Sequence, residues 1–287
     1  MKPRIGIIGG SGVYEMDNIK IIGEEEIDTP FGKPSDKYVI AQVGEKEVVF
    51  LPRHGKGHRI LPSEVNSLAN IYGMKKLGVK FILAVSAVGS LKEEIAVKEF
   101  VIPDQIIDKT KYRNNTYFGN GLVVHVGFAH PFCEYVRKIY INSAKKIMNK
   151  VHEKGIYVCM EGPQFSTKAE SELHRSMGAS VIGMTALPEA KIAREAEICY
   201  ALMAMITDYD CWHETHEIVS ADSVVQVMKE NAENAKKVIY EAIISLDINY
   251  DCDCHHSLAN SIVTDLKIVP EKTLNKLDLI IKKYLQK

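Results

Sequence analysis

The chain has 287 residues, of which 25% are charged, with a formal net charge of −1 and a sequence pI near 6.8. This balance provides no basic field that would concentrate nucleic acid or an anionic membrane, so neither is an expected partner. The longest strongly apolar windows, such as 81–88, are far shorter than the ~20 residues of a membrane span, and the N-terminus lacks the apolar core of a signal peptide, so a cytoplasmic location is expected.

Apolar runs of strand length alternate along the chain with segments of helical periodicity. The runs that predict buried strands are IGII (5–8), VVFL (48–51), KFILAVS (80–86), SVIGM (180–184) and LMAMIT (202–207). The segments that predict helices are 63–77, 133–150, 167–178, a stretch beginning at 188, and 220–246. This alternation is typical of an α/β fold with a mixed, largely parallel twisted central sheet flanked by helices. No linker or repeat divides it, so residues 1–287 are expected to form a single domain.

One helix start and the C-terminal segment carry further signals. Thr167 and Glu170 have the spacing of a capping box, which predicts a helix start. Residues 266–287 form a lysine-rich amphipathic segment after a polar turn. They are expected to form a C-terminal surface helix appended to the domain.

The glycine-rich stretch GIIGGSG at 6–12 follows the first predicted strand, and such turns often bind phosphate. A dinucleotide-binding fingerprint needs a third glycine that opens a helix, but position 15 is Glu15, and Gly23 and the 30–32 turn interrupt any crossover helix. The G-K-[ST] signature of a P-loop is also missing from this stretch. Dinucleotide binding is therefore not favoured.

Several predicted strands end in residues suited to binding an anion or a sugar. In chain order these residues are Ser11, Arg53, His54, Ser86, Ala87, Met184, Thr185, Asp208 and Asp210. Because ligands bind at the carboxyl ends of parallel strands, these side chains could converge in one cleft. Three hydroxyls and the forked guanidinium of Arg53 would suit a dianion. Singly, each has an ordinary alternative as a cap, a turn or a solvated residue, and only their joint placement favours a site.

Asp208 and Asp210 are two residues apart, which on an extended chain directs both carboxylates to the same side. Two carboxylates in one partly dry site do not both ionise freely, so one of them could hold a proton near neutral pH and act as a general acid. A helix N-cap or a surface turn is the alternative interpretation of this pair.

Six cysteines are too few for a secreted disulfide scaffold. The stretch CDCHH at 252–256 looks like a metal site, but its four candidate ligands are packed into five residues with no second pair elsewhere at zinc-site spacing. No metal is therefore predicted.

With these residues assembled, the sequence resembles the 5′-methylthioadenosine phosphorylases of the trimeric purine nucleoside phosphorylase superfamily. The matching segments are GIIGGSG, DTPFGKPSD (28–36), LPRHGKGH (51–58), SAVGSL (86–91), VIPDQIID (101–108), AHPFC (129–133), EGPQFSTKAE (161–170), GMTALPE (183–189) and TDYDCW (207–212). They extend from residue 4 to about 245, and the resemblance weakens beyond residue 246. It implies a nucleoside phosphorylase-like fold and phosphorolysis of 5′-methylthioadenosine to adenine and 5-methylthioribose 1-phosphate. Orthophosphate would be the co-substrate, with no metal or organic cofactor.

The resemblance also implies a role for each matching residue. The phosphate site falls on Ser11, Arg53, His54, Ser86, Ala87 through its backbone N–H, and Thr185. The purine and ribose sites fall on Phe165, Ser166, Met184, Asp208 and Asp210, and the pocket for the 5′-substituent on His58, Ala221, Val224 and Val225. His125 matches a histidine contributed by a neighbouring subunit, which implies a homo-oligomer, either a trimer or a dimer of trimers.

The chemistry implied for Asp208 is proton donation to purine N7 while phosphate attacks C1′. Carboxylates at the base edge suit the 6-amino donor of adenine, whereas 6-oxopurine phosphorylases of the superfamily have Asn at this position. Alternatives that stay open are a purine nucleoside phosphorylase acting on inosine, guanosine or adenosine, a methylthioinosine phosphorylase, and a non-catalytic nucleoside-binding module.

Two further expectations follow from the resemblance alone. Cys133 and Cys199 match positions that are bridged in some heat-loving archaeal members, and the pair Cys252 and Cys254 resembles a strained disulfide near the same end of such chains. At least the Cys133–Cys199 bond is therefore expected. The 266–287 segment could also cover the 5′ pocket of a partner subunit instead of lying on its own surface.

Overall fold

The computed structural model describes residues 2–10, 16, 18–213 and 221–285, apart from the side chains of residues 221–224, 226 and 228. The strands are β1 (Arg4–Gly9), β2 (Lys20–Glu25), β3 (Tyr38–Val43), β4 (Lys46–Pro52), β5 (Val79–Ser90), β6 (Phe100–Val101), β7 (Gln105–Lys109), β8 (Val151–His152), β9 (Ile156–Met160), β10 (Val181–Gly183) and β11 (Cys199–Asp208). The helices are α1 (Ser67–Lys76), α2 (Glu134–Ile147), α3 (Lys168–Ser176), α4 (Glu189–Glu195), α5 (Ala221–Ser245) and α6 (Glu271–Ile281). Short 3₁₀ turns are η2 (Asp253–His256), η3 (Leu266–Ile268) and η4 (Lys282–Tyr284).

The strands form one mixed sheet in the order β2-β3-β4-β1-β5-β10-β9-β7, with β11 paired to the other edge of β5. The parallel pairs are β1–β4, β1–β5, β5–β11, β6–β8, β7–β9 and β9–β10. The antiparallel pairs are β2–β3, β3–β4, β5–β10 and β6–β11. The predicted α/β class with a mixed, largely parallel sheet is confirmed.

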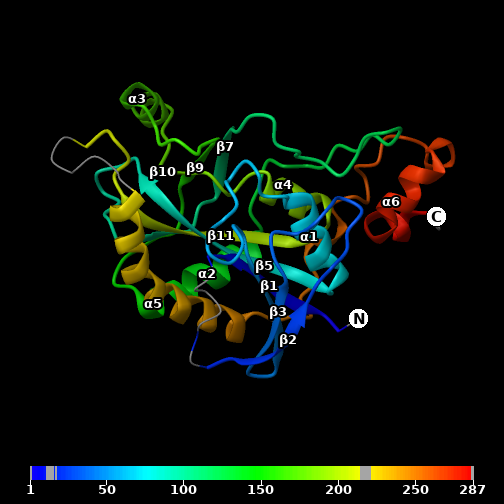
Figure 1. The fold of residues 1–287 in the computed structure, drawn as a ribbon, viewed down its shortest axis with the longest axis horizontal. Helices are drawn as coiled ribbons and strands as arrows, with labels where there is room; N and C mark the ends of the chain where they lie inside the picture. The colour runs from blue at the N-terminus through cyan, green and yellow to red at the C-terminus, as the bar shows by residue number, and fades with distance from the viewer. Residues whose placement is uncertain (1, 11–15, 17, 214–220, 286–287) are drawn as a thin grey trace.

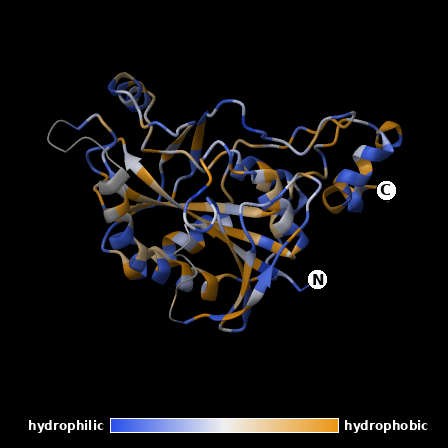
Figure 2. Cartoon of the chain, in the orientation of Figure 1, coloured by the Kyte–Doolittle hydropathy of each residue, from blue (hydrophilic) through white to orange (hydrophobic). Residues whose placement is uncertain are grey.

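Helices cover both faces of this sheet, as Figure 1 shows. One face packs against α1, α4 and α6 in the larger hydrophobic cluster, and the other packs against α2 and α5 in a second cluster. In Figure 2 the central strands are largely hydrophobic, while α5 alternates between hydrophobic and hydrophilic residues along its length. Within the described residues, no helix combines the length and apolar character that crossing a membrane would require.

The predicted strands all exist, but the set was incomplete. The β2–β3 hairpin and strands β7 and β9 were not predicted. β2 is almost entirely exposed at the sheet edge, so its sequence lacks the alternation of a half-buried strand. β3 and β9 are mostly buried, and their short apolar runs were present in the sequence.

The helix signals were accurate where capping chemistry was specific. The capping box of Thr167 and Glu170 forms at the start of α3. α1 begins later than expected, at Ser67, because the side chain of Asn66 accepts the Ala69 N–H and residues 61–65 form a turn instead of the first helical turn.

The C-terminal segment is integrated into the core. α6 buries Leu277, Ile280 and Ile281 in the larger hydrophobic cluster, and these side chains are at most 2% exposed. Thr273 also donates a hydrogen bond to the Asn120 carbonyl. The expected amphipathic helix is thus present, with one face packed on the larger hydrophobic cluster and the other exposed.

The central strand β5 changes partner halfway along one edge, and this change creates the site. Its first part pairs with β1 as far as Ala84, and its last part pairs with β10 from Gly89 onward. Among the described strands, neither of these two pairs with residues 85–88. Ser86 therefore lies inside β5, whereas the sequence placed it at the end of a strand, and the sheet parts beside it.

Candidate active site

Three hydroxyl groups meet beside the stretch of β5 that lies between its pairing with β1 and its pairing with β10. The Oγ of Ser86 lies 2.9 Å from the Oγ1 of Thr185, which follows β10. The Tyr157 hydroxyl on β9 lies beside both but has no hydrogen-bond partner among the described residues, and burial raises the pKa of this phenol to about 12. Hydroxyls with unused hydrogen-bonding capacity in a buried position can bind an oxyanion.

Arg53 is buried beside this cluster, but its fork does not face it. The Nε and Nη2 atoms bind the two carboxylate oxygens of Glu189 at 2.8 and 2.9 Å, and Nη1 donates to the Val85 carbonyl at 2.9 Å. Nη2 also lies 3.4 Å from the Ile8 carbonyl. Of the five N–H donors of an arginine, only one on Nη1 remains for an anion. The expectation of a forked contact between Arg53 and a dianion is therefore corrected.

His54 is neutral in this environment. Burial, with a further contribution from the charge of Arg53, lowers its pKa to about 4. Its Nδ1 lies 2.9 Å from the Ile60 carbonyl, so Nδ1 carries the proton and Nε2 is left as an acceptor. His54 could donate to an anion only after gaining a second proton. Its ring stacks on that of exposed His58, with the centroids 4.5 Å apart.

Asp208 is the last residue of β11 and lies opposite Gly89 of β5. The register shifts between Ile206 and Asp208, and Asp210 has a left-handed φ of 51°, so the chain is not extended here. The two aspartates are still close, because the Asp210 N–H donates to Asp208 Oδ1 at 2.8 Å in a local turn. The pair is thus held in a turn, as in the alternative interpretation of the sequence, and the extended geometry expected for it is not seen.

Opposing influences act on the Asp208 carboxyl, and the net effect is a raised pKa. Burial raises the pKa most, hydrogen bonds from the Thr207 hydroxyl and the Asp210 N–H lower it, and the charge of Asp210 raises it. The Thr207 hydroxyl lies 2.7 Å from Asp208 Oδ2 and 3.2 Å from the Val88 carbonyl oxygen. The hydroxyl donates to Asp208 Oδ2 and is close enough to the Val88 carbonyl to share its proton with both acceptors.

Asp210 provides an unused acceptor in the same place. Its side chain is 8% exposed, and its Oδ2 atom has no hydrogen-bond partner among the described residues. Leaving a buried carboxylate oxygen unpaired is costly, so a ligand that donates a hydrogen bond here would be favoured.

The two groups lie at different points along β5. Gly89, opposite Asp208, lies three residues beyond Ser86. At about 3.3 Å per residue, these two backbone positions are roughly 10 Å apart.

Three other predicted site residues adjoin these groups along the chain or through a contact, and Phe165 precedes one of them. Phe165 is 44% exposed, and the Ser166 carbonyl accepts a hydrogen bond from the Cys211 thiol, next to Asp210. Partly buried Met184 precedes Thr185, and the intermediate exposure of Ala87 leaves β5 accessible beside Ser86.

The remaining predicted residues are not brought to this place by any described contact. Val225 is 48% exposed on α5, and His125 is exposed, with its N–H bound to the Ser261 carbonyl. Ser11 and the side chains of Ala221 and Val224 lie outside the described part of the chain.

Sequence reasoning missed several residues that support the site. Glu189 lies within the quoted GMTALPE segment and also accepts the Tyr200 hydroxyl at 2.8 Å. Arg113 is buried and donates to the carbonyls of Met184 and Leu187, so it holds the loop that carries Thr185. Tyr157 had no local signal, because only the sheet brings β9 next to β10.

The structure contains neither of the expected disulfides. All six cysteines are free thiols, and the Cys133 Sγ lies 3.6 Å from the Cys252 Sγ, against about 2.05 Å in a disulfide. Cys133, Cys199, Cys252 and Cys254 gather within 4.8 Å of one another, so no single pair is selected.

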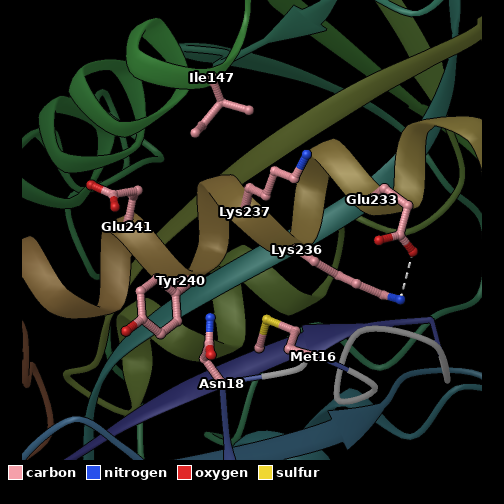
Figure 3. Close-up of a pocket in the computed structure, with 8 residues that line it drawn as sticks. All are labelled: Met16, Asn18, Ile147, Glu233, Lys236, Lys237, Tyr240 and Glu241. Atoms are coloured by element: carbon pink, nitrogen blue, oxygen red, sulfur yellow. Dashed lines mark hydrogen bonds and ion pairs between the residues drawn. The ribbon is translucent and has the colours of Figure 1, made fainter.

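A separate hollow of about 360 Å³ lies between α5, α2 and the segment after β1 (Figure 3). It is lined by Met16, Asn18, Ile147, Glu233, Lys236, Lys237, Tyr240 and Glu241. None of the predicted site residues is among them. Its charges are partly neutralised, since Lys236 pairs with Glu233 at 2.9 Å and Glu241 pairs with Lys146 at 2.9 Å. This hollow is not the candidate site.

Comparison with known proteins gives one consistent relationship. The phosphorylase superfamily matches the chain over residues 4–244. An S-methyl-5′-thioadenosine phosphorylase from Koribacter versatilis is 53% identical over 284 residues, which is 99% of this chain and 97% of that protein. One from Geobacter sulfurreducens is 52% identical over 285 residues, which is 99% of this chain and 100% of that protein.

Solved structures agree with the sequence relatives. A crystal structure of a methylthioadenosine phosphorylase from an antarctic soil metagenomic library has a TM-score of 0.93 and 46% identity, covering 97% of this chain and 98% of that one. A mutant adenosine/methylthioadenosine phosphorylase from Schistosoma mansoni, in complex with methylthioadenosine, has a TM-score of 0.79 and 41% identity, covering 85% of this chain and 91% of that one. The chain therefore belongs to the phosphorylase superfamily, and within it to the group of the S-methyl-5′-thioadenosine phosphorylases.

Proposed function

We propose that this protein phosphorolyses 5′-methylthioadenosine to adenine and 5-methylthioribose 1-phosphate. The observation that carries the proposal is the arrangement along β5: the hydroxyls of Ser86 and Thr185 form a pair inside the strand, and Asp208 lies opposite Gly89, three residues further along. The names of relatives that are 53% and 52% identical over nearly the full chain support this choice of substrate.

The hydroxyl end is proposed to bind orthophosphate. Ser86 and Thr185 would turn their hydroxyls from each other to the anion, with the Ala87 N–H, Ser11 and the remaining Nη1 donor of Arg53 as further ligands. Glu189 balances the charge of Arg53, so hydrogen bonds contribute more here than net positive charge. The nearby dianion would raise the pKa of His54 and favour the doubly protonated ring, which could then donate. A phosphate oxygen then attacks C1′ of the ribose.

The carboxylate end is proposed to bind adenine. Breaking the N-glycosidic bond places negative charge on the purine, and Asp208 would donate a proton to N7. General acid catalysis of this kind contributes about 10²- to 10⁴-fold in rate. The unpaired Oδ2 of Asp210 suits the 6-amino donor of adenine, whereas the 6-oxo acceptor of hypoxanthine would leave it unpaired.

The reaction needs no metal or organic cofactor, since phosphate supplies the nucleophile and Asp208 the proton. We propose that the protein acts in the cytoplasm as a trimer or a dimer of trimers. Exposed His125 would reach the site of a neighbouring subunit, and His58, Val224 and Val225 would line the pocket for the 5′-methylthio group.

The test is a rate comparison on the purified full-length protein. Methylthioadenosine, adenosine, methylthioinosine and inosine are incubated with and without phosphate, and free base and sugar phosphate are separated by chromatography. We expect phosphate-dependent release of adenine, with the highest kcat/KM on methylthioadenosine and a loss of at least about 10²-fold for the 6-oxopurines. Adenine release without phosphate, binding without turnover, or a preference for inosine would each contradict the proposal.

A further inference from the structure

Four cysteine side chains from distant parts of the chain meet outside the proposed active site. Cys133 precedes α2, Cys199 begins β11, and Cys252 and Cys254 lie at the start of the η2 turn. Their four sulfur atoms all lie within 4.8 Å of one another. The structure thus supplies the second pair of ligands that the sequence analysis could not find for the CDCHH stretch.

The spacing of the sulfurs matches a tetrahedral metal centre more closely than a disulfide. Four thiolates at about 2.3 Å from a central zinc ion are about 3.8 Å from one another. The Cys133 and Cys252 sulfurs are 3.6 Å apart. A metal at the centre would therefore need only small side-chain shifts, whereas each disulfide would need one pair to close to about 2.05 Å.

His255 lies beside the sulfurs but is placed as a donor to them. Its Nδ1 accepts the Cys252 N–H at 3.4 Å, so the proton is on Nε2, which lies 3.4 Å from the Cys199 Sγ and 3.3 Å from the Lys80 carbonyl. The His255 backbone N–H also donates to the Cys252 side chain. Hydrogen bonds of this kind to the ligand atoms orient a metal site and stabilise thiolates.

Access to the four sulfurs also fits a metal. Cys133 is 2% exposed and Cys199 is 0% exposed, whereas Cys252 and Cys254 are partly exposed. An ion could enter from the side of η2 and end in a largely buried position.

We propose that Cys133, Cys199, Cys252 and Cys254 bind one zinc ion through four thiolates at the junction of α2, β11 and η2. All four thiols lose their protons as the four Zn–S bonds form, and no electron is transferred. The role of the ion is structural: it fixes the C-terminal segment to the start of β11. Because a closed four-thiolate site has no open position, the ion takes no part in phosphorolysis.

The first test measures zinc in the full-length protein after reduction, zinc loading and removal of free metal. We expect about one zinc per chain by elemental analysis. In Cys252→Ser/Cys254→Ser, zinc should fall to less than about a tenth of that value, while Cys211→Ser, a cysteine outside the cluster, should keep it. Zinc should also raise the Tm of the wild type but not of the double variant.

A spectroscopic test does not depend on the variants folding. Cobalt added to the reduced wild-type protein should give the intense visible bands of a tetrahedral site and a sulfur-to-cobalt charge-transfer band. Failure of the reduced protein to take up zinc or cobalt would overturn the proposal. Cys133–Cys199 or Cys252–Cys254 disulfides, found by peptide mapping of protein isolated without reductant, would also overturn it. Retention of zinc by the double variant would do the same.

Discussion

At the scale of single residues, the environment of Asp208 governs the proposed chemistry. Replacement by alanine removes the acid. The Thr207 hydroxyl, which donates to Asp208 Oδ2, can then donate to the Val88 carbonyl or to water. We expect Asp208→Ala to keep the fold and to lose about 10²- to 10⁴-fold in kcat. Steady-state kinetics and circular dichroism check this, with Asp278→Asn on the exposed side of α6 as the control. Undiminished turnover in Asp208→Ala would reject the acid role.

The pH dependence of the reaction follows from the same carboxyl. Only protonated Asp208 can donate, so kcat/KM should fall as pH rises through its pKa, which burial and the charge of Asp210 hold above the usual value. Asp210→Asn removes that charge and should lower the pKa of Asp208, so this limb should move to lower pH. Profiles recorded at the same phosphate concentration give the comparison. A limb that stays in place or moves to higher pH would contradict the assignment.

Gly89 leaves the space that Asp208 occupies. A Cβ added at Gly89 would lie 2.8 Å from Asp208 Oδ1 and 3.3 Å from the Asp210 nitrogen. We expect Gly89→Ala to displace the carboxyl and lower kcat by about 10²-fold with the fold retained. Gly23→Ala is the matched control, since nothing lies within 4 Å of its added Cβ. Equal activity of the two variants would show that the position of Asp208 is not critical.

At the scale of secondary-structure elements, the site depends on how β4, β5 and α4 are joined. Arg53 follows β4 and binds Glu189, the first residue of α4, while its Nη1 donates to the backbone of β5. Both side chains of the ion pair are at most 4% exposed. This pair fixes the three elements around the place where β5 changes partner.

Breaking the pair should therefore affect stability as well as activity. Glu189→Gln leaves the charge of Arg53 buried without its partner, and we expect the free energy of unfolding to fall by about 3–5 kcal/mol. Urea unfolding measures this. Glu94→Gln is the control, because Glu94 is 67% exposed in a loose 3.9 Å pair with Lys92 and should change stability by no more than about 0.5 kcal/mol. Similar losses in both variants would remove the special role of the buried pair.

At the scale of the whole molecule, the C-terminal helix closes the larger hydrophobic cluster. Lys283 and Tyr284 also bind the carboxylate of Glu197, just before β11, so the end of the chain is tied to the strand that carries Asp208. Figure 1 shows α6 close to the C-terminus and away from α3, at the opposite end of the molecule. The C-terminal surface helix thus contributes to the core through its packed face.

This packing predicts a stability effect that an appended helix would not have. Leu277 is 1% exposed, so Leu277→Ala should lower the free energy of unfolding by about 2–5 kcal/mol through lost burial and a cavity. Leu285→Ala, at a side chain that is 38% exposed, should cost no more than about 0.5 kcal/mol. Unfolding of both variants followed by tryptophan fluorescence and circular dichroism compares them. A Leu277→Ala variant as stable as the wild type would show that the packed face of α6 does not stabilise the fold.

The sequence by itself determined the α/β class, the main strands and helices, and the family. Periodicity reports burial, the Thr167 capping box is local chemistry, and segments such as GMTALPE are specific enough to identify relatives. It also predicted that Ser86, Thr185, Asp208 and Asp210 share one site, and the structure pairs Ser86 with Thr185 and Asp208 with Asp210.

Only the tertiary structure decided which groups those residues face. The partner of Arg53 is 136 residues away in Glu189, the partner change in β5 depends on two other strands, and the cysteines meet from three segments. Local sequence encodes periodicity and capping, because these depend on neighbours within a few positions. Hydrogen-bond partners across a sheet, the direction of a guanidinium and the spacing of four sulfurs depend on contacts between residues that the chain brings together only when it folds.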